Sequence, residues 1–191
     1  YIHIPKNGGH SIVDLVRNRP PHKWTKVNLP LTAKDIVKHS IDLDTSYVFT
    51  FVRNPYTRFL SGWKNLYHKY VQKTGIRYSK SKDFNATKEY FARNYKRFDN
   101  NVVDCDIHLN YTQTQHLNVV LEKTDKFYRF ENFNEEYAKL SNRLYGIDKI
   151  PTKRFKSPIV TPYTEWFTPQ IISYVNDKFH DDFVNFNYQK D

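Results

Sequence analysis

The sequence predicts an α/β protein with a single domain over residues 1–191, in which a mainly parallel central sheet is flanked by helices. Three observations lead to this prediction. Strand-like and helix-like stretches alternate along the chain. Residues 47–52 (YVFTFV) form a β-rich apolar run, as expected of a central strand. From Pro55, a residue that suits the first turn of a helix, apolar side chains recur at spacings of three and four.

The first part of the chain alternates strand and helix signals. Residues 1–5 predict a first strand, and two adjacent glycines then predict a turn into a helix over 10–18. Residues 25–29 suit a short strand. Thr32 suits the start of a short helix, because Asp35 would lie in its first turn.

The second part continues the alternation. Glycine and proline signals set two boundaries: Gly146 closes one helix, and Pro169 follows the N-cap residue Thr168 in another. The stretch 101–116 gives no clear pattern. The remaining expected elements are loops at 73–83 and 147–165, a strand at 126–130, and helices at 86–97, 131–145 and 169–179.

Composition limits the class of protein. There are 30 Lys and Arg against 20 Asp and Glu, which gives a net charge of +10 and predicts an acidic partner. Aromatic residues make up 17% of the chain and can build a core, which argues against disorder. The single cysteine, Cys105, excludes an intrachain disulfide and a cysteine-based zinc site.

The first motif is HIPKNGGHS at residues 3–11, between a predicted strand and a predicted helix. Adjacent glycines let backbone N–H groups converge, the helix start adds a positive dipole end, and Lys6 and Ser11 add a charge and a hydroxyl. This pattern predicts a cradle for phosphate or sulfate. It is not a Walker A loop, because the lysine precedes the glycines. The alternative is a tight turn with a surface lysine and a capping serine.

The second motif is FTFVRNPYTRFLS at residues 49–61. Arg53 falls where the strand ends, which is the edge at which open α/β sheets bind ligands. Ser61 follows two helical turns later, so the two side chains can hold one phosphate. The alternative is that Arg53 pairs with a carboxylate and that Ser61 serves packing.

Together the two motifs resemble those of the sulfotransferases that use 3′-phosphoadenosine 5′-phosphosulfate (PAPS). The two motifs resemble most the carbohydrate sulfotransferase branch, of Golgi and bacterial type, whose signatures are roughly HIPKTGGTS and FxFVRNPYxRxxSxY. Here Asn7 and His10 replace threonines, and Trp63 replaces the last aromatic residue.

Looser matches extend the resemblance over nearly the whole chain. Residues 128–133 (YRFENF) resemble the family's RFEN segment, and residues 181–188 resemble its DFxxFxY close. Residues 106–109 (DIHL) with Gln113 or Gln115 resemble DxHxxPQ, although the proline is missing.

The resemblance implies a fold with a P-loop-like core and an enzyme that moves a sulfuryl group from PAPS to an acceptor hydroxyl. Transfer would be in line, without a metal, and would leave 3′-phosphoadenosine 5′-phosphate (PAP). Lys6 would neutralise the leaving phosphate, and Arg53 with Ser61 would hold the 3′-phosphate. The other donor-binding residues it implies are Asn7, Gly8, Gly9, His10 and Ser11 in the loop, and Arg154 and Lys156 in a basic segment that closes over the nucleotide.

The general base is less clear from the sequence. Related enzymes place a histidine or glutamate before the arginine-bearing strand, where this chain has apolar residues at 29–31. Three histidines remain as candidates: His108, ranked first for its neighbouring aspartates, His10 in the loop, and His39. The alternative for each is a solvated or structural imidazole.

The acceptor is expected to be a carbohydrate, anionic or neutral. Lysines and arginines between 64 and 97 alternate with tyrosines, which favours an anionic polymer, although a solvated helix face explains them equally. Other readings are a P-loop nucleotide or metabolite kinase, a basic nucleic-acid-binding module, and a family member without catalysis. The compartment would be the Golgi lumen in a eukaryote with a membrane anchor before Tyr1, and the cytoplasm otherwise.

Overall fold

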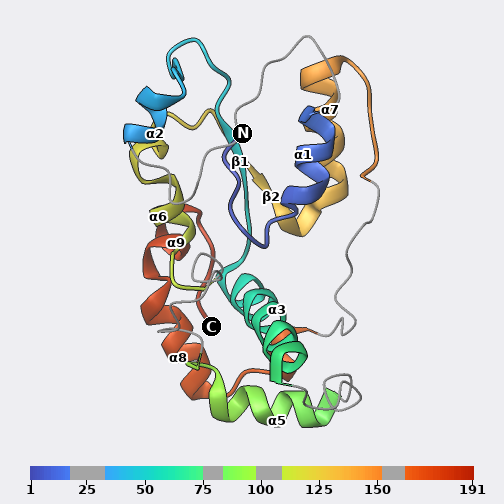
Figure 1. Ribbon diagram of the computed structural model, residues 1–191, viewed down its shortest axis with the longest axis vertical. Coiled ribbons are helices and arrows are strands. Elements are labelled where there is room, and N and C mark those ends of the chain that lie inside the picture. The colour runs from blue at the N-terminus through green and yellow to red at the C-terminus, as the bar shows by residue number, and fades with distance from the viewer. Residues whose placement is uncertain (18–32, 75–83, 98–108, 152–161) are drawn as a thin grey trace. The chain divides into compact units, whose positions relative to one another are not determined.

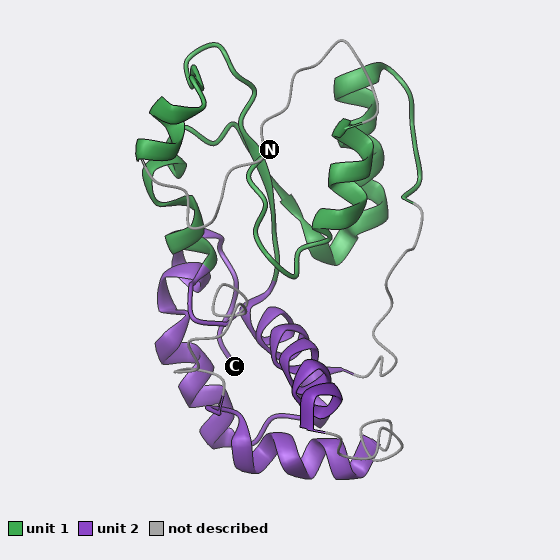
Figure 2. Ribbon diagram, in the orientation of Figure 1, with its two compact units in different colours: residues 1–53, 113–156 green, residues 54–112, 157–191 purple. Residues whose placement is uncertain are grey.

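The computed structural model describes residues 1–17, 33–74, 84–97, 109–151 and 162–191 (Figure 1). The chain divides into two compact units (Figure 2). Unit 1 comprises residues 1–53 and 113–156, and unit 2 comprises residues 54–112 and 157–191. That residues 1–191 form a single domain stays a prediction.

The sheet of unit 1 is parallel, as the sequence predicts. Strand β1 (Phe49–Val52) is fully buried and pairs in parallel with β2 (Lys126–Arg129) from the first residue of each strand to the last. Ile2 adds a parallel bridge beside Thr50, and its backbone N–H donates to the carbonyl oxygen of Phe49 over 3.0 Å. The described part of the chain is therefore α/β, with a small parallel sheet flanked by helices.

Three predicted strands are longer than the observed ones. The run expected at 47–52 forms a strand only from Phe49. The strand expected at 1–5 is a single bridge at Ile2, because Pro5 has no N–H to donate and the chain turns at Lys6. The strand expected at 126–130 ends one residue early, because Phe130 begins a 3₁₀ turn, η3 (Phe130–Asn132).

Two helices of unit 1 pack together on the sheet. Helix α1 (Gly9–Arg17) and helix α7 (Phe133–Tyr145) lie side by side in Figure 1, and the phenolic oxygen of Tyr145 donates to the carbonyl oxygen of Leu15 over 3.2 Å. Helix α7 ends at Gly146, as predicted, in the left-handed conformation. The buried cluster they share with the strands consists of Ile12, Leu15, Val16, Phe49, Phe51, Tyr128, Tyr137 and Leu140.

Unit 1 also contains short helices. Helix α2 (Ala33–Lys38) confirms the short helix predicted near residue 32. Helix α6 (Gln113–Leu117) begins inside the stretch that gave no clear pattern, and the 3₁₀ turn η2 (Asn118–Val120) follows it. A helix of five residues has too little length to show a periodicity, so the sequence could not reveal α6. The strand expected at 25–29 lies outside the described residues.

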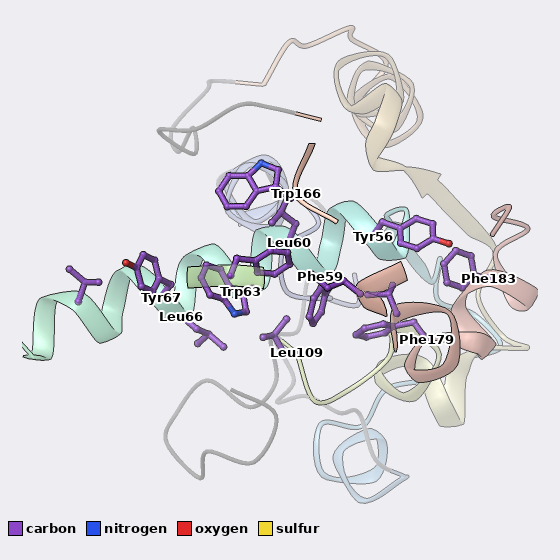
Figure 3. Packing of buried hydrophobic residues seen from close by; sticks show 14 residues of the cluster. Tyr56, Phe59, Leu60, Trp63, Leu66, Tyr67, Leu109, Trp166, Phe179 and Phe183 are labelled. Atoms are coloured by element: carbon purple, nitrogen blue, oxygen red, sulfur yellow. The ribbon is translucent and has the colours of Figure 1, made fainter. Parts of the chain in front are cut away.

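Unit 2 is built around helix α3 (Pro55–Thr74), which confirms the amphipathic helix predicted after Pro55. Figure 3 shows its apolar face, where Tyr56, Phe59 and Trp63 are each 0% exposed. Trp63 stacks on Tyr67 with ring centroids 5.0 Å apart. The aromatic content of the chain thus supplies this core.

The other described elements of unit 2 contribute to the same core. Helix α5 (Phe84–Asn94) begins two residues before the helix predicted at 86–97 and ends three residues before its predicted end. Helix α8 (Pro169–Lys178) lies within its predicted range and begins on Pro169 as expected. The 3₁₀ turn η4 (Tyr163–Glu165) precedes α8, and helix α9 (His180–Asn185), which the sequence did not predict, follows it.

A buried cation belongs to unit 2. The guanidinium of Arg58 is 1% exposed and donates from Nη1 and Nη2 to the carbonyl oxygen of Tyr111 over 3.2 and 3.1 Å. Burial lowers the pKa of Arg58 to about 10, and the negative charge of Asp182 partly offsets this effect. Because this pKa lies well above neutral pH, the guanidinium stays charged and needs these partners.

Replacing this cation should destabilise unit 2. Arg58→Ala leaves the buried carboxylate of Asp182 without its opposite charge, so we expect a loss of about 3–5 kcal/mol in urea denaturation. Lys69→Ala, at an exposed position of the same helix, is the control and should change stability little. Equal stabilities of the two variants would contradict the assigned role of Arg58.

Candidate functional site

The candidate site is the loop that joins the bridge at Ile2 to helix α1. Lys6 and Gly8 both have positive φ, at 73° and 80°, so the backbone turns sharply before α1 begins at Gly9. The N–H of Ser11 donates to the carbonyl oxygen of Gly8 over 3.0 Å. The turn that the paired glycines predicted is therefore confirmed, and it leads directly into the helix N-terminus.

Both glycines are needed because other side chains approach the loop closely. A Cβ at Gly8 would lie 2.5 Å from Cε2 of Phe133 in α7, and a Cβ at Gly9 would overlap the imidazole of His3. His3 also stacks on Tyr1, with ring centroids 6.0 Å apart. His3 therefore has a packing role, between Tyr1 and the loop.

The charges near the loop favour an anion. The first N–H groups of a helix point out of its N-terminus and carry a partial positive charge, and α1 begins within the loop. Lys6 adds a full positive charge, and residues 3–11 contain no aspartate or glutamate. This combination suits the oxygens of a phosphate or sulfate group.

Arg53 joins the loop to the sheet. It directly follows β1, and its Nη1 donates to the carbonyl oxygen of Lys6 over 3.0 Å. Its guanidinium carbon lies 4.4 Å from the ring centroid of Phe130. The structure thus brings together one residue from each of the two sequence motifs, at the carboxyl end of the parallel strands.

Asn7 has a different role from its neighbours. Its side chain is 0% exposed, and its Nδ2 donates to the carbonyl oxygen of Phe51 over 2.6 Å and to Oε1 of Gln113 over 2.8 Å. Both amide protons are therefore directed at the protein interior. Among the predicted donor-binding residues, Asn7 can contribute its backbone N–H but not its side-chain N–H groups to a ligand.

The sequence did not single out Gln113 as a site residue. Its side-chain Oε1 accepts from the backbone N–H of Arg53 over 2.8 Å, and its Nε2 donates to the carbonyl oxygen of Arg53 over 2.7 Å. The partial match to DxHxxPQ was the available signal, but it did not distinguish Gln113 from Gln115. Gln113 is 0% exposed, whereas Gln115 is exposed.

The candidate bases and the remaining predicted residues lie in different parts of the chain. His10 is exposed in the first turn of α1, beside the loop. His39 is exposed just after α2, which lies across the strands from α1 in Figure 1. Ser61 is partly buried on α3 in unit 2, so its expected pairing with Arg53 stays a prediction. Three further predicted residues lie outside the described residues: His108, Arg154 and Lys156.

Within the described ranges, no group of three or more His, Cys, Asp or Glu side chains could hold a metal ion. The helices in these ranges are also too short or too polar to cross a membrane.

Two glycine substitutions can separate backbone strain from the close approach at the loop. Gly8 and Gly146 both have positive φ, but a Cβ at Gly146 meets nothing within 4 Å. Gly146→Ala should therefore lose about 1–2 kcal/mol of stability, the cost of the left-handed conformation. Gly8→Ala should lose more in the same denaturation assay, because its Cβ would meet the ring of Phe133. Equal losses would show that Gly8 is needed for its backbone conformation alone.

Comparison with protein-family models gives a match over residues 1–189, to a model described as the sulfotransferase family. Comparison with curated proteins gives no match, and comparison with solved structures gives none either. The matched span covers the loop, Arg53 and every element described above. Because it extends over almost the entire chain, the protein belongs to the sulfotransferase family.

Proposed function

We propose that this sulfotransferase uses PAPS as its donor and transfers the sulfuryl group to a hydroxyl of a carbohydrate. The observation that carries the proposal is the contact of Arg53 with the backbone of Lys6, at 3.0 Å, which joins the two motifs at one end of the sheet. Membership of the family supports sulfuryl transfer in general.

The residues at the loop fit an anionic donor. Lys6, the start of α1 and Arg53 supply positive charge, and residues 3–11 carry no carboxylate. When bound, PAPS supplies a sulfuryl group activated by its bond to the 5′-phosphate. Lys6 would neutralise charge on that phosphate, and the backbone N–H groups of Gly8, Gly9 and His10 would bind its oxygens, because the N–H of Ser11 already donates to the carbonyl oxygen of Gly8.

The 3′-phosphate is the group that distinguishes PAPS from ordinary adenine nucleotides. The guanidinium of Arg53 can bind a phosphate through two parallel hydrogen bonds. Pairing with Ser61, and closure of the segment with Arg154 and Lys156, are parts of the proposal that come from the family resemblance.

The acceptor hydroxyl needs a base. The exposed position of His10 in the first turn of α1 supports it as a candidate, while His108 and His39 stay in the proposal on the sequence argument. The base would accept the hydroxyl proton as the oxygen attacks sulfur.

An anionic carbohydrate is the acceptor we propose, because unit 2 combines cations with aromatic rings. The guanidinium carbon of Arg97 lies 4.4 Å from the ring centroid of Tyr70, and Nζ of Lys96 lies 5.6 Å from that of Tyr95; both cations are exposed and both rings are partly exposed. Rings beside cations can pack on sugar faces while the charges bind sulfates or carboxylates.

Calorimetric titration with PAP tests the donor. We expect binding at tens of micromolar or tighter, and no binding in that range would contradict the proposal.

Arg53→Ala should weaken PAP binding about tenfold or more, because a charge-assisted contact to phosphate is lost. Turnover that requires ATP and magnesium would instead indicate a kinase.

Lys6→Ala should act mainly on the chemical step. We expect kcat to fall about 100-fold or more, since charge on the leaving phosphate is no longer neutralised, with a smaller change in PAP affinity. The control is Lys139→Ala, on the exposed face of α7 in the same unit. Unchanged kcat in Lys6→Ala would contradict the role given to Lys6.

The three candidate bases can be compared by single substitutions to alanine at positions 10, 39 and 108. In the variant that lacks the true base, kcat should fall about 100-fold or more. That variant should also lose the low-pH limb of its activity profile, because the limb reports protonation of the base. The other two variants should keep the limb. Retention of the limb in all three would exclude these histidines as the base.

A further inference from the structure

We propose that Gln113 is a positioning residue that holds the loop and Arg53 in one fixed arrangement for donor binding. The proposal rests on the proposed function and assigns a role to a residue outside both sequence motifs. Each contact it uses lies within unit 1.

Gln113 continues the sheet where the strand pairing stops. The last residue pair of the two strands is Val52 with Arg129, so the next residue of the chain, Arg53, follows the paired segment. The side chain of Gln113 accepts from the N–H of Arg53 over 2.8 Å and donates to its carbonyl oxygen over 2.7 Å. This two-way pairing is what a neighbouring strand would offer, and it fixes the backbone from which the guanidinium extends.

The same amide also fixes the loop. Oε1 of Gln113 accepts a second hydrogen bond, from Nδ2 of Asn7 over 2.8 Å. Asn7 lies between Lys6 and Gly8, the two residues with positive φ. A shift of Gln113 would therefore move the loop backbone as well as Arg53.

These contacts form a closed ring. Gln113 binds Arg53, Nη1 of Arg53 donates to the carbonyl oxygen of Lys6 over 3.0 Å, and Asn7, the next residue, returns to Gln113. Gln113 and Asn7 are each 0% exposed, so water does not compete for these groups. A ring of this kind couples the position of Lys6 to that of Arg53. In the proposed function, Lys6 contacts the 5′-phosphate of the donor and Arg53 contacts its 3′-phosphate.

Gln113→Met tests this role, because it keeps the volume of the side chain and removes its hydrogen bonds. The matched control is Thr50→Val in β1, which removes a buried hydrogen bond of 2.8 Å from Thr50 Oγ1 to the carbonyl oxygen of Ile2, a residue ahead of the motif at 3–11. Both variants should melt at lower temperature than the wild type. Gln113→Met should bind PAP about tenfold or more weakly and raise the KM for PAPS, while Thr50→Val should stay within about twofold of the wild type.

A second variant, Gln113→Glu, tests the same role if Gln113→Met does not fold. Gln113→Glu keeps an acceptor for Arg53 and Asn7 but turns an oxygen toward the carbonyl oxygen of Arg53, so it should also weaken PAP binding. Wild-type affinity in a folded variant at position 113, or an equal loss in Thr50→Val, would overturn the positioning role while leaving the proposed function intact. Failure of the wild type to bind PAP would overturn the proposed function and this role with it.

Discussion

The arrangement of the candidate site depends on one constraint, which is that the backbone polar groups at the end of β1 need partners where the sheet stops. Val52 is the last residue of β1 that pairs with β2. Beyond it, the amide of Gln113 takes over the pairing with Arg53 and also holds Asn7. A buried N–H or carbonyl group without a partner is costly, so this region allows few alternative arrangements.

Two aromatic side chains of unit 1 also contact the loop and Arg53. Phe133 lies so close to Gly8 that a Cβ there would meet its ring, and the ring of Phe130 faces the guanidinium of Arg53 at 4.4 Å. Both phenylalanines come from the chain that follows β2, so the second strand and its turn also shape the loop. Unit 2 has a separate aromatic core around Trp63, with the buried cation of Arg58 as its main polar feature.

Much of this could be predicted from the sequence, and the failures have physical causes. The apolar run of β1 and the amphipathic face of α3 are repeated local patterns, and the structure has both. The strand at 1–5 was too long because Pro5 and the turn at Lys6 interrupt pairing. Helix α6 is too short to show a period. For the candidate site, the motifs named Lys6, Asn7 and Arg53 as donor-binding residues, but they could not show that the side-chain amide of Asn7 faces the interior.

The sequence by itself determined the fold class, the family and the two motifs, because each of these is a pattern of residue types along the chain. It could not determine that Asn7, Arg53 and Gln113 share one hydrogen-bond network, since Gln113 lies 60 residues from Arg53 and 106 from Asn7. Such contacts depend on which backbone groups lack partners after the strands have paired. Only the tertiary structure decides that, because pairing brings distant segments together and leaves specific N–H and carbonyl groups to be satisfied.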